Sequence, residues 1–109
     1  MSILEKNNTE NVFPSKEQLR DILDKYQAGR LNDAEKLAIS ISQEFPKHQF
    51  AWKVLGVIFG QTGRNSEAVH ANQTAVSLSP QDAEAHYNLG NVLKAQGRLD
   101  EALASYKQA

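Results

Sequence analysis

The side chains most capable of chemistry are few in this sequence and lie far apart. The three histidines are His48, His70 and His86, and no two of them have the spacing of three or four residues that places side chains on one helix face. The chain has no cysteine, which excludes disulfides, thiolate metal sites and a cysteine nucleophile. Acidic residues are scattered without a like-charged pair on one apolar face. We therefore predict no catalytic residue, no metal site, no cofactor and no enzymatic activity.

The glycines near residue 60 and the single tryptophan could suggest a nucleotide or nucleic-acid site, but neither has the surroundings that such a site needs. Gly56, Gly60 and Gly63 lack the preceding strand and the Lys-Ser/Thr ending that a phosphate-binding loop needs. Trp52 has the flat ring of a base-stacking platform, but its place among apolar residues predicts a core position. Its replacement by alanine would then cost about 3–5 kcal/mol.

The overall composition limits the partners. Of 109 residues, 40% are hydrophobic and 23% are charged, and the formal net charge is −1, so bulk attraction to nucleic acid or to an anionic membrane is not expected. No apolar run approaches the roughly 20 residues of a membrane span. The polar N-terminus lacks the features of a signal peptide. We expect a cytoplasmic protein that binds neither membranes nor nucleic acid.

Glycine, alanine and proline recur with a period of 34 residues. Each of the three Gly-Arg dipeptides is followed, five residues after its glycine, by an alanine, and two prolines keep the same spacing. A polar residue that caps helices well also follows each glycine by three residues. These columns are Gly29, Gly63 and Gly97; Ala34, Ala68 and Ala102; Pro46 and Pro80; and Asn32, Ser66 and Asp100.

Each column has a physical reason in a helix-turn-helix unit. Glycine ends a helix because it adopts the left-handed conformation at little cost. Alanine allows two helices to approach closely, and proline stops the second helix because it lacks an N–H. The polar column is predicted to cap the next helix, and Ser15 with Gln18 fits a capping box. Apolar residues at helical spacing, such as Leu19, Ile22, Leu23 and Tyr26, support the same reading.

The middle unit resembles the tetratricopeptide repeat. It reads Trp52-x2-Leu55-Gly56-x2-Phe59, then Ala68, Ala75 and Pro80, and only the phenylalanine column departs, with Asn72. The third unit has Leu89-Gly90-x2-Leu93, then Ala102, Tyr106 and Ala109, with His86 in the tryptophan column. The resemblance implies an all-α fold, a right-handed α-solenoid of antiparallel helix pairs with about three 34-residue units.

The expected organisation is a flexible tail at residues 1–14, a degenerate repeat at 15–48, a second repeat at 49–82 and a truncated third repeat at 83–109. The last unit stops before its closing proline and any capping helix. We expect a fragment of a longer protein, or self-association through the face around Leu103, Tyr106 and Ala109.

In this family the first helix of each unit lines a concave groove, so the resemblance implies a scaffold that binds a protein or peptide segment there, with mild preference for acidic ligands. The alternative is a substrate-recruiting or regulatory region of a larger enzyme such as a glycosyltransferase or sulfotransferase. The carboxylate clamp of the family is not expected, because Leu19, Leu23 and Val54 occupy its columns. The predicted groove residues are Lys16, Arg20, Tyr26, Lys53, Val57, Gln61, Tyr87, Asn88, Asn91 and Lys94.

Overall fold

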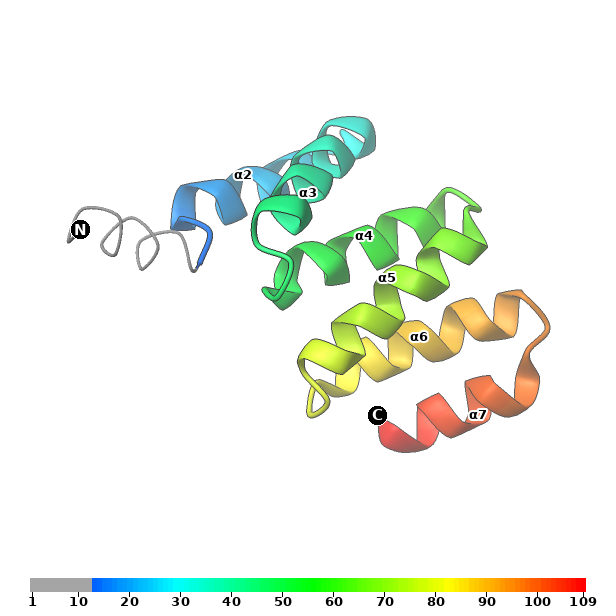
Figure 1. Ribbon diagram of the computed structural model, residues 1–109. Coiled ribbons are helices and arrows are strands. Elements are labelled where there is room, and N and C mark those ends of the chain that lie inside the picture. The colour runs from blue at the N-terminus through cyan, green and yellow to red at the C-terminus, as the bar shows by residue number, and fades with distance from the viewer. Residues whose placement is uncertain (1–12) are drawn as a thin grey trace. The chain divides into compact units, whose positions relative to one another are not determined.

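A computed structural model describes residues 13–109 (Figure 1). The expectation of a flexible tail falls almost entirely on residues 1–12, outside this range. The described residues form helices and turns without a strand, which confirms the all-α prediction. The helices are α2 (Lys16–Gln27), α3 (Leu31–Glu44), α4 (Gln49–Gln61), α5 (Asn65–Leu78), α6 (Ala83–Ala95) and α7 (Leu99–Gln108).

The helices form pairs, and the chain divides into two compact units after His48. In the first unit α2 packs against α3. In the second unit α4 packs against α5, α5 against α6, and α6 against α7, and α4 also touches α6. Two successive helix hairpins therefore share one interior in the second unit, as the resemblance implied.

The glycine column ends the first helix of each pair, as predicted. The three glycines have φ of 78°, 77° and 78°, the left-handed region in which a β-carbon is strained. After each glycine the arginine N–H donates to a carbonyl five residues earlier, as in Arg64 N to Phe59 O at 2.9 Å. This bond closes the helix. The second helices α3 and α5 end two residues before Pro46 and Pro80.

The predicted cap column is wrong. The helices α3, α5 and α7 begin one residue after each Gly-Arg dipeptide, and their N-cap residues are the arginines, without a side-chain cap hydrogen bond. The backbone bond after each glycine places the arginine at the helix start, so the polar column lies inside the first turn. The residues that were expected to cap and do not are Asn32, Ser66 and Asp100. The capping box of Ser15 and Gln18, in contrast, is formed.

The alanine column lies at the centre of each helix pair. Ala34, Ala68 and Ala102 are 0%, 0% and 2% exposed, as expected for small residues between packed helices. Larger residues fill the space around these contacts. The buried side chains include Ile22, Ala38, Ile41 and Phe45 in the first unit and Leu55, Ile58, Phe59, Ala75, Ala85, Leu89 and Leu93 in the second.

Trp52 was predicted to be a core residue, and this is only partly right. Its side chain is half-buried, and its ring meets the ring of exposed His70 edge-to-face, with centroids 5.9 Å apart. The buried side of α4 is already filled by Leu55, Ile58 and Phe59. Trp52, in the first turn of the helix, therefore packs at the margin of the interior.

Candidate binding pocket

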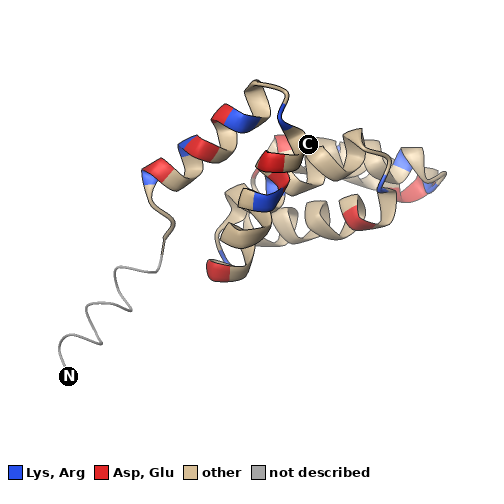
Figure 2. Ribbon diagram, turned by 90° about the horizontal axis from the view of Figure 1, so that it is seen from above, with Lys and Arg blue, Asp and Glu red and all other residues tan. Residues whose placement is uncertain are grey.

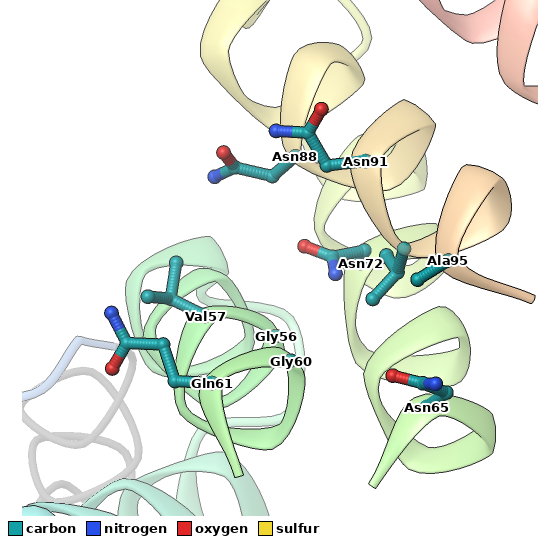
Figure 3. A pocket seen from close by; sticks show the side chains of 10 residues that line it. Gly56, Val57, Gly60, Gln61, Asn65, Asn72, Asn88, Asn91 and Ala95 are labelled. Atoms are coloured by element: carbon teal, nitrogen blue, oxygen red, sulfur yellow. The ribbon is translucent and has the colours of Figure 1, made fainter. Parts of the chain in front are cut away.

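A pocket of about 260 Å³ lies among α4, α5 and α6 (Figure 3). Two of the predicted groove residues on α4 line it, Val57 and Gln61, together with two on α6, Asn88 and Asn91. The structure thus gathers part of the predicted binding surface around one hollow. The other residues that line it are Gly56, Gly60, Asn65, Asn72, Val92 and Ala95.

The pocket has amide and apolar walls and no charged side chain. The glycines, valines and alanine give it apolar surface, and five asparagine and glutamine side chains give it hydrogen-bond donors and acceptors. The helices behind it carry little charge: α4 has Lys53 as its one charged residue, and Figure 2 shows much of this unit in tan. Such walls are suited to binding a neutral group.

Asn72 is one of the six residues that line this pocket without having been predicted. It comes from α5, is 1% exposed, and its Nδ2 donates to the Ala68 carbonyl at 2.9 Å. Its Oδ1 is buried and accepts no hydrogen bond from the described residues. Its signal in the sequence was the departure from the phenylalanine column. It lies on α5, the second helix of its unit, whereas the predicted groove residues all lie on first helices.

The phenylalanine column holds Asn72 in the second repeat and Tyr106 in the third. A β-carbon on Gly90 would lie 2.6 Å from a ring carbon of Tyr106, and one on Gly56 would lie 2.3 Å from Asn72 Oδ1. The two pairs are therefore equivalent contacts, with an aromatic ring in the third repeat and a short amide in the second. The Tyr106 hydroxyl donates to Asn91 Oδ1 at 2.7 Å, which fixes the orientation of the Asn91 amide at the pocket.

Lys53 is engaged within the molecule. Its Nζ lies 2.9 Å from Asp82 Oδ2 and 2.6 Å from Glu84 Oε1. Burial lowers the pKa of Lys53, but the hydrogen bonds to Glu84 and Asp82 outweigh this effect and raise it. The hydrogen bonds from Lys53 and then Gln49 lower the pKa of Asp82 to about 2. The charge of Lys53 is thus offset by two carboxylates.

The remaining predicted residues lie outside the pocket. Tyr87 and Lys94 lie on α6 with exposed side chains, and Tyr87 packs against Tyr106 with ring centroids 5.7 Å apart. Lys16 and Arg20 are exposed on α2 and Tyr26 is half-buried there, in the first unit. The structure therefore joins four of the ten predicted residues in one pocket.

The histidines take part in packing rather than in a cluster. His86, in the tryptophan column, is 8% exposed and its Nε2 lies 2.8 Å from the Pro80 carbonyl oxygen. Within residues 13–109 there is no group of three or more histidines and carboxylates placed to hold a metal ion. A helix of the length and apolarity required to cross a membrane is also absent from that range.

Comparisons with known proteins point to one family. A family model described as TPR repeat matches residues 56–97. Protein O-mannosyl-transferase TMTC1 of Mus musculus is 31% identical over 105 residues, which cover 91% of this chain and 11% of the relative. The chain thus spans about a tenth of the length of that relative.

Solved structures share the fold. A mutant of the Thermobaculum terrenum O-GlcNAc transferase is 30% identical with a TM-score of 0.81, over 85% of this chain and 18% of that one. The Yersinia enterocolitica type III secretion chaperone SycD, in complex with a peptide of the translocator YopD, has a TM-score of 0.81 over 85% of this chain and 71% of that one. Its 17% identity shows likeness of fold alone.

Proposed function

Since this chain is an array of tetratricopeptide-type repeats, we propose that it is a scaffold that binds a peptide or protein segment, and that the pocket among α4, α5 and α6 is part of its contact surface. The observation that carries the proposal is the gathering of Val57 and Gln61 with Asn88 and Asn91 around one hollow. Amide side chains on such a surface can bond the N–H and C=O groups of an extended ligand. The peptide complex of SycD supports the proposal, because a chain with the same fold accommodates a peptide.

The pocket argues for a protein ligand of low charge. Nucleic-acid binding draws most of its affinity from cations placed against phosphates, and no cationic side chain lines the pocket. The preference for acidic ligands rested partly on Lys53, whose charge is offset by Asp82 and Glu84. We therefore expect amides, more than cations, to select the ligand in this unit.

A library of random peptides displayed on phage, selected against the protein, tests the proposal. Peptides should be enriched, and their affinity, measured by fluorescence anisotropy, should fall about tenfold with Asn88→Ala, the loss of one to two hydrogen bonds. Asn32→Ala, at an exposed asparagine of α3, is the matched control and should leave binding unchanged. No enrichment, or equal binding by the Asn88→Ala variant, would exclude this surface.

A second proposal is that the chain serves as the recruiting region of a larger enzyme and carries no reaction itself. It is supported by the names of the mouse relative and of the Thermobaculum neighbour, both transferases. Deletion of these repeats from a full-length enzyme should then lower kcat/KM for protein acceptors and leave short acceptors unaffected. Equal losses for both acceptors would contradict a recruiting role.

Self-association through α7 is a further proposal for the chain taken alone. Leu99 and Leu103 are 62% and 56% exposed, and they are one helical turn apart on the same face. Sedimentation should show a concentration-dependent dimer that Leu103→Glu converts to monomer. A monomer at every concentration would remove the proposal.

A further inference from the structure

The strongest unexplained feature of the pocket is the Asn72 carboxamide on its wall. Its Oδ1 is buried without a hydrogen bond from the described residues, and an unpaired buried acceptor of this kind costs about 1–3 kcal/mol. Buried polar groups are nearly always paired, and an exception has a reason. In the equivalent place Tyr106 has its hydroxyl paired with Asn91, so the repeat itself does not demand an unpaired group.

The space near Asn72 exists because an asparagine stands in the column that carries Tyr106 one repeat later. The side chain of Asn72 is shorter than the ring that the column carries at Tyr106, and it lies against Gly56, which adds no side chain. In Figure 3 the carboxamide of Asn72 is directed toward the space between α4 and α6, with Gly56 and Gly60 on the facing wall. The hollow of about 260 Å³ admits a side chain of a ligand.

The second polar group at the pocket is Asn91. Because its Oδ1 accepts the Tyr106 hydroxyl, its Nδ2 is left on the other side of the amide, and Figure 3 shows that nitrogen directed toward Asn88. Asn72 thus supplies an acceptor and Asn91 a donor. Asn72 Oδ1 lies against Gly56, and the amide torsion of an asparagine has a broad minimum. Presenting Oδ1 to an incoming group therefore requires a rotation that weakens the bond from Asn72 Nδ2 to the Ala68 carbonyl.

The chemistry of these walls selects among side chains. A carboxylate would meet the Asn72 oxygen without a cation, and an ammonium or guanidinium group would lose its hydration without a counter-charge, because no charged residue lines the pocket. An aliphatic group would leave Oδ1 unpaired. A primary amide both donates and accepts, so it can donate to Asn72 Oδ1 and accept from another of the amide side chains that line the pocket.

We propose that this pocket is a specificity site for the primary amide of a glutamine or asparagine side chain in the bound peptide, with Asn72 on its wall. The site rests on the proposed peptide-binding function and adds to it a preference at one position of the ligand. Apolar contact with Val57 and Val92 accommodates the methylene groups of glutamine.

The test uses the full chain and two probes. The first is the set of peptides selected from the phage library, each synthesised with glutamine and with glutamate at its most enriched amide position. The second is N-acetyl-glutamine amide, titrated into the ¹⁵N-labelled protein up to its solubility limit and compared with N-acetyl-glutamate amide. Side-chain NH₂ signals of asparagines report on the pocket directly in the nuclear magnetic resonance spectrum.

The expected result is at least a tenfold weaker binding of the glutamate peptides, and a shift of the Asn72 and Asn91 side-chain signals with the glutamine probe only. Asn72→Leu, which keeps the branched shape and the number of heavy atoms, should remove the preference for glutamine. Gln73→Leu, at the exposed neighbouring position, is the matched control and should retain it.

Gly60→Ala provides a variant that keeps the fold. A β-carbon at this position meets Val92 Cγ1 at 3.6 Å, an ordinary contact, and alanine is the better helix former. The added methyl group narrows the pocket, so binding of glutamine peptides should fall several-fold while thermal stability is kept or raised.

Three outcomes would overturn the inference. Enriched peptides without an amide position would overturn it and leave the proposed function intact. Retention of the glutamine preference by the Asn72→Leu variant would assign Asn72 to packing alone. A glutamine probe that shifts neither asparagine signal would overturn the amide site, whether or not peptides are enriched. Failure to enrich any peptide is a different result, and it counts against the proposed function.

Discussion

The Asp82 carboxylate connects the second repeat to the third, and its replacement tests how much this connection stabilises the fold. It accepts hydrogen bonds from Lys53 Nζ and Gln49 Nε2 of α4, each at 2.9 Å. It also caps α6 by accepting from Ala85 N at 3.2 Å. Asp82→Asn keeps an oxygen for the cap and removes the charge, whereas Asp82→Ala removes both.

The lowered pKa of Asp82 gives the size of the stability loss expected for Asp82→Asn. The hydrogen bonds from Lys53 and Gln49 lower it from the ordinary value of 3.8 to about 2, and a difference of this size corresponds to about 2 kcal/mol. The side chain is 21% exposed, so screening by water reduces the expected loss for Asp82→Asn to about 1–2 kcal/mol. Asp82→Ala should cost about 1 kcal/mol more, the value of a cap.

The sign of the pH dependence follows from the lowered pKa. A carboxylate whose pKa falls on folding stabilises the protein fully above its unfolded value, and this stabilisation is lost as the pH falls from about 4 to about 2. Urea unfolding followed by circular dichroism should therefore separate the native protein from the Asp82→Asn variant at neutral pH. The two curves should approach each other as the pH falls toward about 2 and converge below it, where the carboxylate is protonated in the folded protein as well.

The control is Glu101→Gln, because Glu101 also has a lowered pKa through its hydrogen bond from Arg98 but lies on the exposed surface of α7. Its replacement should leave the unfolding midpoint unchanged. An equal loss for Asp82→Asn at both pH values would refute the electrostatic reasoning. Equal losses for the two Asp82 substitutions would refute the capping role.

Three further substitutions test the packing and the turns. Asn72→Leu should raise the free energy of unfolding by about 1–2 kcal/mol, because it removes an unpaired buried oxygen at equal size. A lower free energy of unfolding in a urea titration would contradict the burial of Oδ1. Trp52→Ala should cost only about 1–3 kcal/mol in thermal melts, less than a fully buried tryptophan, and a larger loss would restore it to the core. Gly63→Ala should cost about 1–2 kcal/mol because of its positive φ, and an unchanged melting temperature would show that the turn relaxes.

The features that could be predicted from the sequence are those that depend on local backbone constraints. Gly63 must end a helix because its φ of 77° is strained for other residues, and Ala68 must be small because the helices meet there. Both constraints act within a few residues and recur at a fixed spacing. They are therefore visible as columns in the sequence.

The features that were missed depend on partners distant in the sequence or on the detailed register. The polar column lost its expected capping role because the bond from Arg64 N to Phe59 O starts the next helix earlier. The ion pair of Lys53 with Asp82 joins residues 29 positions apart, and no spacing rule predicts it. The half-buried place of Trp52 depends on which side of α4 the other helices cover, and hydrophobicity alone does not give that side.

The phenylalanine column carries both kinds of information. Its spacing identified Asn72 as a departure from the family pattern, but only the structure places its oxygen against Gly56 and its side chain on the wall of a pocket that Asn91 also lines. A sequence that breaks a local rule without an internal partner does so most often at a functional site. The glycine and alanine columns hold the helices together whatever residue occupies this position, so a repeat of this kind can change its ligand preference through one column and keep its fold.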